Sequence, residues 1–157
     1  MADEPTPYQR LLREAAAASS EPEPDCARVE ATLQAAVKLE PDNPLAHHMI
    51  AVTRGRLHDH TGASKAFVLA SERYPRGSSE WAETTSAAFV RLTRKECAKV
   101  PKPGWWTDAA LLELSERVVA AAPDSGGCWQ MRATVLGAFE ECAARGLVSS
   151  RCVPWPG

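Results

Sequence analysis

The chain has 157 residues, of which 45% are apolar and 24% are charged, and its formal net charge is −2. This composition is typical of one soluble globular domain with a real core, and the near-neutral charge argues against nucleic acid as a partner. No apolar run approaches the roughly 18 residues that a membrane span requires, and the acidic start at 1–5 is unlike a secretory signal.

Apolar residues recur at steps of three and four residues between proline-rich breaks, which predicts about seven helices and no strands. After a disordered segment at 1–6, the helices are expected at about 7–19, 25–39, 44–57, 63–74, 78–99, 107–122 and 128–145. The predicted N-caps are Thr6, Asp25, Asn43, Ser78 or Ser79, and Thr107. The tail at 147–157 shows no periodicity and is expected to be irregular.

The same periodicity predicts which side of each helix is buried. Phe67 and Ala70 are expected to face inward from the fourth helix, and Phe89 and Leu92 from the fifth. On the third helix the inward stripe is expected to extend to Leu57. On the last helix the predicted inward residues are Trp129, Arg132, Ala133, Leu136 and Phe139.

The prolines that end alternate helices are regularly spaced. Pro41 and Pro75 lie 34 residues apart, and the longer interval from Pro75 to Pro123 contains an insertion at about 95–106. A period near 34 with paired helices is typical of a solenoid, in which each hairpin buries its apolar face by stacking on the next. A generic array of helical hairpins, or a helical bundle with accidental proline spacing, are the alternatives.

The best-kept copy of this repeat has Ala63, Phe67, Ala70 and Pro75 at spacings of 4, 3 and 5, preceded by the small residue Ala51. With these residues the sequence resembles the tetratricopeptide repeat (TPR) family. The resemblance extends to the aromatic first-helix position in later repeats, where Trp81 and Trp129 stand. His47 and Ser115 depart from the family pattern, because both stand where a large apolar or aromatic residue is usual.

The resemblance implies an all-α, right-handed solenoid of antiparallel helical hairpins in one domain at 7–146. The hairpins would span about 7–41, 44–75 and 78–123, and the helix at 128–145 would cap the array. It also implies a non-enzymatic cytoplasmic scaffold or adaptor that binds a protein or peptide in a concave groove lined by the first helix of each hairpin. By repeat position, the groove residues would be Arg13, His48, Val52, Arg56, Ser86, Phe89 and Gln130.

One subclass of the family grips the C-terminal carboxylate of heat-shock chaperones with a clamp of Lys, Asn, Asn, Lys and Arg. The corresponding positions here are Gln9, Arg13, Met49, Ser79 and Glu83. Since the clamp residues are absent and Glu83 would repel a carboxylate, chaperone tails are not expected to bind.

No group of residues predicts catalysis, a metal site or a cofactor. His47 and His48 are adjacent in a helix and point about 100° apart, and the two turn histidines, His58 and His60, are too few for a metal site. The five cysteines form no CxxC pair, and their odd number indicates free thiols in a reducing intracellular compartment. Cys97 is expected at a solvated, charged helix end.

Three tryptophans suggest an alternative function. Trp105 and Trp106 are adjacent within the insertion, where an extended chain would direct one side chain inward and leave the other exposed. Trp155 in the tail is expected either to cover the last helix or to be exposed. Because exposed tryptophans are favoured interface anchors, the alternative is a helical accessory subunit of a larger enzyme or assembly, docking through Trp105, Trp106 and Trp155.

Overall fold

The computed structural model describes residues 4–145 and is all-α over that range, with seven α helices and no strand. The helices are α1 (Pro7–Ser19), α2 (Cys26–Leu39), α3 (Pro44–Arg56), α4 (His60–Arg73), α5 (Ser79–Leu92), α6 (Asp108–Ala121) and α7 (Gly126–Ala144). A short 3-10 turn, η1 (Lys95–Cys97), follows α5. The predicted all-α class and number of helices are therefore confirmed for the described part of the chain.

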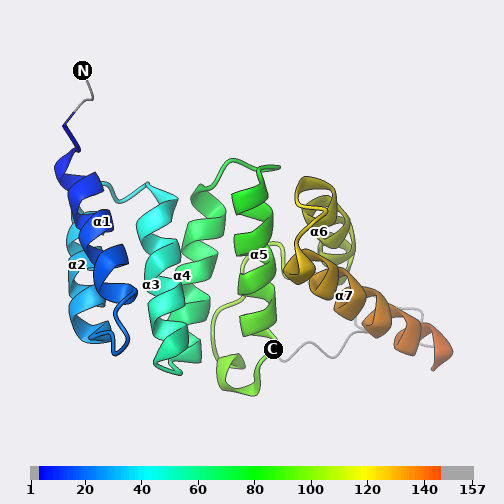
Figure 1. The fold of residues 1–157 in the computed structure, drawn as a ribbon. Coiled ribbons are helices and arrows are strands. Elements are labelled where there is room, and N and C mark those ends of the chain that lie inside the picture. The colour runs from blue at the N-terminus through cyan, green and yellow to red at the C-terminus, as the bar shows by residue number, and fades with distance from the viewer. Residues whose placement is uncertain (1–3, 146–157) are drawn as a thin grey trace.

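Each helix packs against the next one along the chain from α1 to α7, and α5 also contacts α7. Figure 1 shows α1 to α5 side by side in a row, with α6 and α7 following at the far end. Neighbours in sequence are thus neighbours in space. Apart from the longer segment between α5 and α6, the connections are short, which leaves each helix little choice of partner.

Side-chain caps determine where most helices begin. Thr6 and Gln9 form a reciprocal capping box, in which the Gln9 amide donates to Thr6 Oγ1 at 3.2 Å and the Thr6 amide donates to Gln9 Oε1 at 3.0 Å. The other predicted caps that accept a backbone hydrogen bond are Asp25, Asn43, Ser78 and Thr107. These starts follow from local chemistry, because a short polar side chain satisfies amides that the first turn leaves unpaired.

The turn between α3 and α4 is shorter than predicted. Helix α4 starts at His60, because Asp59 Oδ1 accepts a hydrogen bond from the Gly62 amide at 2.8 Å. His58 absorbs the change of direction with a positive φ of 58°. Leu57, predicted to face inward, is 52% exposed because α3 has already ended before it.

The core consists of two main clusters of buried side chains. One lies between α1, α2, α3 and α4 and includes Leu33 and Phe67. The other joins α5, α6 and α7 and includes Phe89 and Leu111. Trp105, in the loop before α6, packs against both clusters and against a small third one at the end of α5. The segment between α5 and α6 therefore helps to join the two main clusters.

Helix α5 is shorter than the sequence predicts, ending at Leu92 rather than near Lys99. The Lys102 ammonium group donates to the carbonyl oxygens of Leu92 at 3.3 Å and Cys97 at 3.0 Å. A cation at these carbonyls stabilises the end of a helix. Partial burial lowers the pKa of Lys102. Cys97 is fully buried in this loop, which corrects its predicted place at a solvated helix end.

The buried face of helix α7 differs in part from the one predicted, because Phe139 packs against the second cluster as expected but other residues do not. Its buried side chains are Cys128, Met131, Val135 and Cys142. Of the residues expected to face inward, Trp129 and Leu136 are exposed to 53% and 37%. Helix α7 is apolar on more than one side, so periodicity alone does not select the face. Contact with α5 selects the face that is buried, because Cys128 is small enough to approach Ser86 of α5. The Cys128 Sγ atom lies 3.3 Å from the Ser86 Oγ atom.

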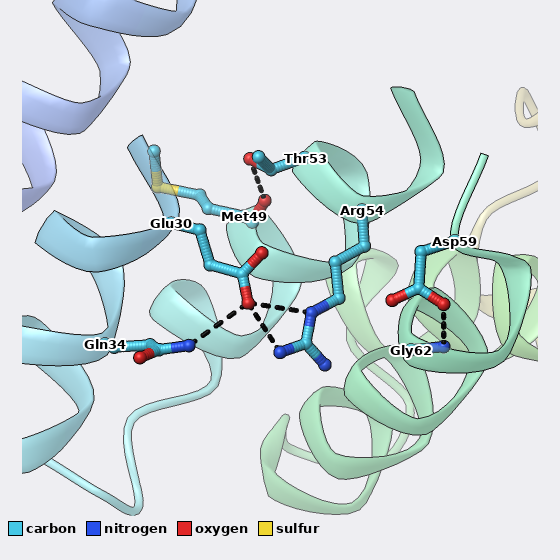
Figure 2. Close-up of polar contacts among 7 residues, drawn as sticks. All are labelled: Glu30, Gln34, Met49, Thr53, Arg54, Asp59 and Gly62. Carbon is cyan, nitrogen blue, oxygen red and sulfur yellow. Dashed lines mark hydrogen bonds and ion pairs between the residues drawn. The ribbon is translucent and has the colours of Figure 1, made fainter. Parts of the chain in front are cut away.

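An ion pair joins α2 to α3 (Figure 2). Glu30 Oε1 accepts hydrogen bonds from Arg54 Nε at 2.9 Å and from Gln34 Nε2 at 3.1 Å. The Arg54 and Glu30 side chains are only 28% and 19% exposed, so water screens this pair less than an ordinary surface pair. The interaction fixes the position of α3 along α2.

We expect Gly62→Ala to destabilise the protein by about 1–2 kcal/mol, although alanine is the better helix former. A Cβ atom at Gly62 would overlap the capping carboxylate of Asp59 and lie 2.9 Å from Arg54 Cδ. Gly137→Ala is the matched control, because its Cβ meets no atom within 4 Å, and it should stabilise by about 0.5–1 kcal/mol. Urea unfolding measures both changes, and stabilisation by both substitutions would contradict the close approach at Gly62.

Candidate functional site

Two hollows contain most of the residues that the sequence assigns to a groove. The N-terminal hollow, about 240 Å³, lies between α1, α2 and α3 and is lined by Ala16, Ser19, Ser20, Val29, His48, Met49, Val52 and Thr53. The C-terminal hollow, about 380 Å³, lies between α4, α5 and α7 and is lined by Phe67, Glu83, Ser86, Ala87, Val90, Arg91, Arg94, Gly127 and Gln130. Together they form the candidate site.

The N-terminal hollow has an apolar wall and a basic edge. Val52 is 39% exposed in it. One turn further along α3, Arg56 Nη1 donates to Ser19 Oγ at 2.7 Å and to the Ser19 carbonyl at 3.1 Å, which ties the ends of α3 and α1 together. Arg13 is exposed and lies one turn before Ala16, so helical spacing puts it on the same side of α1. The structure thus brings these three predicted residues to one surface.

His48 connects the two hollows. It lines the first, and its Nδ1 lies 3.0 Å from Thr84 Oγ1 of α5, next to Glu83 of the second. The rings of Phe67 and Tyr74 meet it edge-on, with centroid distances of 5.6 and 6.4 Å. Burial lowers the pKa of His48, and the charge of Glu83 opposes this only in part. The imidazole is therefore neutral at pH 7, where it offers packing and hydrogen bonding rather than charge.

Two of the predicted groove residues on α5 are buried. Ser86 is 1% exposed, and its hydroxyl donates to the Ala82 carbonyl at 2.8 Å, so it contributes only to the floor of the C-terminal hollow. Phe89 is also 1% exposed, with its ring centroid 5.4 Å from that of Trp106. Neither side chain is presented to a partner, which corrects the groove assignment for both residues.

Sequence reasoning missed Ala87 and Val90, which α5 presents to this hollow beside Glu83, and Arg94, which lies just beyond the end of α5. Glu83, Ala87 and Val90 follow one another at steps of 4 and 3 residues, so they form one stripe of α5. This stripe is the sequence signal that could have identified these residues, because it lies beside the buried stripe of the same helix. Across the hollow, the predicted residue Gln130 of α7 is exposed.

Trp105 and Trp106 are both half-buried, with ring centroids 5.7 Å apart. The expectation that one of them is exposed therefore does not hold. Trp105 packs against all three clusters, and the Lys102 ammonium lies 5.3 Å from the centre of the Trp106 ring. Trp155 lies outside the described residues.

Among the described residues, neither hollow contains a cluster of side chains suited to hold a metal ion. Over residues 4–145, no group of three or more His, Cys, Asp or Glu side chains is arranged to hold a metal ion. Cys26, Cys97 and Cys128 are free thiols, and that of Cys97 donates to the His60 carbonyl at 3.4 Å. What the site offers is apolar contact area, hydrogen-bonding groups and exposed arginines.

Comparison of the chain with protein-family models, with curated proteins and with solved structures found no match. None of the described helices combines the length and the apolar composition needed to cross a membrane.

Proposed function

We propose that this protein is a non-enzymatic interaction scaffold that binds a peptide or helix of another protein across the two hollows. The observation that carries the proposal is the pair of hollows itself, joined through His48 and bordered by α1, α3, α5 and α7. An elongated ligand contacts both hollows at once. Such ligands gain affinity from several modest contacts rather than from one deep pocket.

The charges and apolar groups of the hollows indicate the chemistry of the ligand. The arginines at their edge are Arg13, Arg56, Arg91 and Arg94. Two exposed carboxylates accompany them: Glu83, and Glu96, whose Oε2 lies 3.8 Å from Arg94 Nε. The walls offer Val52, Met49 and Val90 as apolar contacts. The ligand that complements this surface has acidic side chains interspersed with apolar anchors, because opposite charges steer encounter and apolar burial supplies affinity.

We further propose that the helices form a TPR-like array. Supporting this, positions related by the proline spacing have similar environments. The residues five before each proline, Ala36, Ala70 and Val118, are all fully buried. In the third repeat Ser115 replaces the aromatic residue, and Arg132 donates to its hydroxyl at 3.0 Å. Trp129 is the exception, because its expected role in the core is taken by smaller residues of α7.

Arg13→Glu should weaken binding of such a peptide by about 3- to 10-fold, because it reverses an exposed charge at the edge of the hollow. Lys65→Glu is the matched control, an equal charge change at an exposed position of α4 outside both hollows. A peptide-display selection on the wild-type protein supplies the ligand, and fluorescence anisotropy of the selected peptide measures its affinity. Equal loss of affinity in both variants, or selection of basic peptides, would contradict the proposed site.

A second candidate function, the accessory subunit of a larger assembly, is favoured by one observation. Three large apolar side chains on α6 and α7 are exposed: Leu112, Trp129 and Leu136. In an array these helices present the face on which a further helix would stack. Under this function Trp129→Ser abolishes assembly with the larger complex, whereas under the scaffold function it leaves peptide affinity unchanged.

A further inference from the structure

A further concave surface lies on the side of α3 that faces away from the N-terminal hollow. This α2–α4 groove has a volume of about 450 Å³, and its lining includes Val37, Lys38, Ile50, Arg54, Lys65 and Leu69. On α3, Ile50 and Val52 are two residues apart and therefore point about 160° apart. The same holds on α4 for Leu69 and for Phe67, which lines the C-terminal hollow. The groove is therefore separate from both hollows of the candidate site.

Contacts beside the groove fix its shape. Arg54 Nε of α3 donates to Glu30 Oε1 of α2 at 2.9 Å (Figure 2). About two turns earlier on α3, His47 Nε2 lies 2.9 Å from the Pro41 carbonyl oxygen. The same oxygen accepts a hydrogen bond from Arg73 Nε of α4 at 3.1 Å. Because these contacts hold α2, α3 and α4 together, the groove is preformed, and binding does not bear the cost of ordering it.

The floor of the groove is apolar. It is formed by Val37, Ile50 and Ala66, and Leu69 is 40% exposed beside them. A cavity of about 150 Å³ holds one benzene-sized molecule, and this groove has about three times that volume. It therefore has room for several aliphatic side chains of a ligand.

Every charged residue in the lining is basic: Lys38 of α2, Arg54 of α3 and Lys65 of α4. Arg54 is paired with Glu30, whereas the two lysines are exposed and form no ion pair with a carboxylate among the described residues. Since α3 contacts both α2 and α4, the lysines stand on opposite sides of the apolar floor. A complementary ligand therefore has negative charge on both sides of an apolar strip.

A helix fits this lining better than an extended peptide or an acyl chain. The lining belongs to the sides of three helices, whose backbone groups are paired within each helix. Among its uncharged polar side chains, Gln34 Nε2 and His47 Nε2 already have partners. An extended peptide would leave its amides without protein partners here, whereas a helix pairs them internally. An acyl chain would stay partly in water, because exposed residues such as Leu69 border the groove.

We propose that the α2–α4 groove binds an amphipathic helix of a partner protein, with an apolar stripe flanked on both sides by Asp or Glu. The stripe contacts Val37, Ile50 and Leu69, and the flanking carboxylates pair with Lys38 and Lys65. This interaction does not rest on the function proposed for the two hollows, because it uses the opposite sides of α3 and α4.

Fluorescence anisotropy with a synthetic helix tests the proposal. The probe is a lactam-stapled peptide of about 15 residues, roughly four turns, with leucine along one side and glutamate on both flanks of that stripe. Its twin has lysine in place of every glutamate. The glutamate peptide should bind saturably and at least about 10-fold more tightly than the twin, and added salt should reduce the difference. Absence of saturable binding, or equal affinities for the two peptides, would overturn the proposal.

Charge reversal at the two lysines locates the site. Lys38→Glu and Lys65→Glu should each weaken binding of the glutamate peptide by about 3- to 10-fold, and the double variant should prefer the lysine twin. Leu69→Ala should weaken both peptides, because it removes apolar contact without changing charge. Lys99→Glu is the matched control, an equal charge change at an exposed position outside the groove. An equal loss in Lys99→Glu would show that the peptide responds only to overall charge, which would overturn the proposal.

Two further measurements separate this groove from the other possible sites and ligands. Arg13→Glu, at the edge of the N-terminal hollow, should leave affinity for the glutamate peptide unchanged. If affinity fell in Arg13→Glu but not in Lys65→Glu, the peptide would occupy the hollows, so the groove proposal would fail and the proposed function would stand. Dodecanoate below its micelle-forming concentration should not displace the peptide. Displacement by dodecanoate would mean that the groove takes an acyl chain, and the helix proposal would be wrong.

Discussion

Replacing Phe67 with alanine should lower the free energy of unfolding by about 3–5 kcal/mol. Phe67 is 5% exposed and belongs to the cluster that joins α1, α2, α3 and α4. Its ring also meets His48 edge-on at 5.6 Å. Removing it leaves a cavity where several helices converge, and rigid helices cannot collapse to fill such a space. Urea unfolding of the purified protein measures the loss.

Leu69→Ala on the same helix is the control, because Leu69 is 40% exposed. It should cost less than about 1 kcal/mol, since little apolar area is lost from the interior. If Phe67→Ala cost no more than Leu69→Ala, the cluster between α1 and α4 would not be the core of the protein, and the repeat that places Phe67 there would lose its main support.

Phe89→Ala should also destabilise the protein by about 3–5 kcal/mol. The sequence gives Phe89 two roles, on the buried side of α5 and in a binding groove, and these predict different results. As a groove residue it would affect only binding. In the structure it is 1% exposed and packs on Trp106, which predicts a large loss of stability. Thermal and urea unfolding distinguish the two outcomes.

The informative control for Phe89 is Trp129→Ala, because periodicity assigns Trp129 to the core. Trp129 is 53% exposed, and its indole N–H donates to the Pro123 carbonyl at 2.7 Å. We expect its removal to cost less than about 1.5 kcal/mol, the size of one exposed hydrogen bond and some partial burial. A larger cost for Trp129→Ala than for Phe89→Ala would mean that α7 buries its other face.

In the first half of the chain the sequence determined the helices and most of their inward residues, with the turn between α3 and α4 and the exposed Leu57 as exceptions. Prolines such as Pro41 and Pro75 end helices by steric exclusion, and caps such as Thr6 and Asn43 begin them through hydrogen bonds within a few residues. These are local effects, so no knowledge of the fold is needed to predict them. Phe67 was predictable because its helix has only one large aromatic residue to bury.

Only the tertiary structure decided which faces meet where more than one is suitable. Helix α7 is apolar on two sides, and its contact with α5 buries Cys128 and leaves Trp129 exposed. The end of α5 depends on Lys102, ten residues further along the chain. The cavity lined by Trp81, Thr85 and Trp105 likewise forms where α4, α5, α6 and the loop before α6 meet. Such features depend on the fit between surfaces distant in sequence, which periodicity within one helix does not encode.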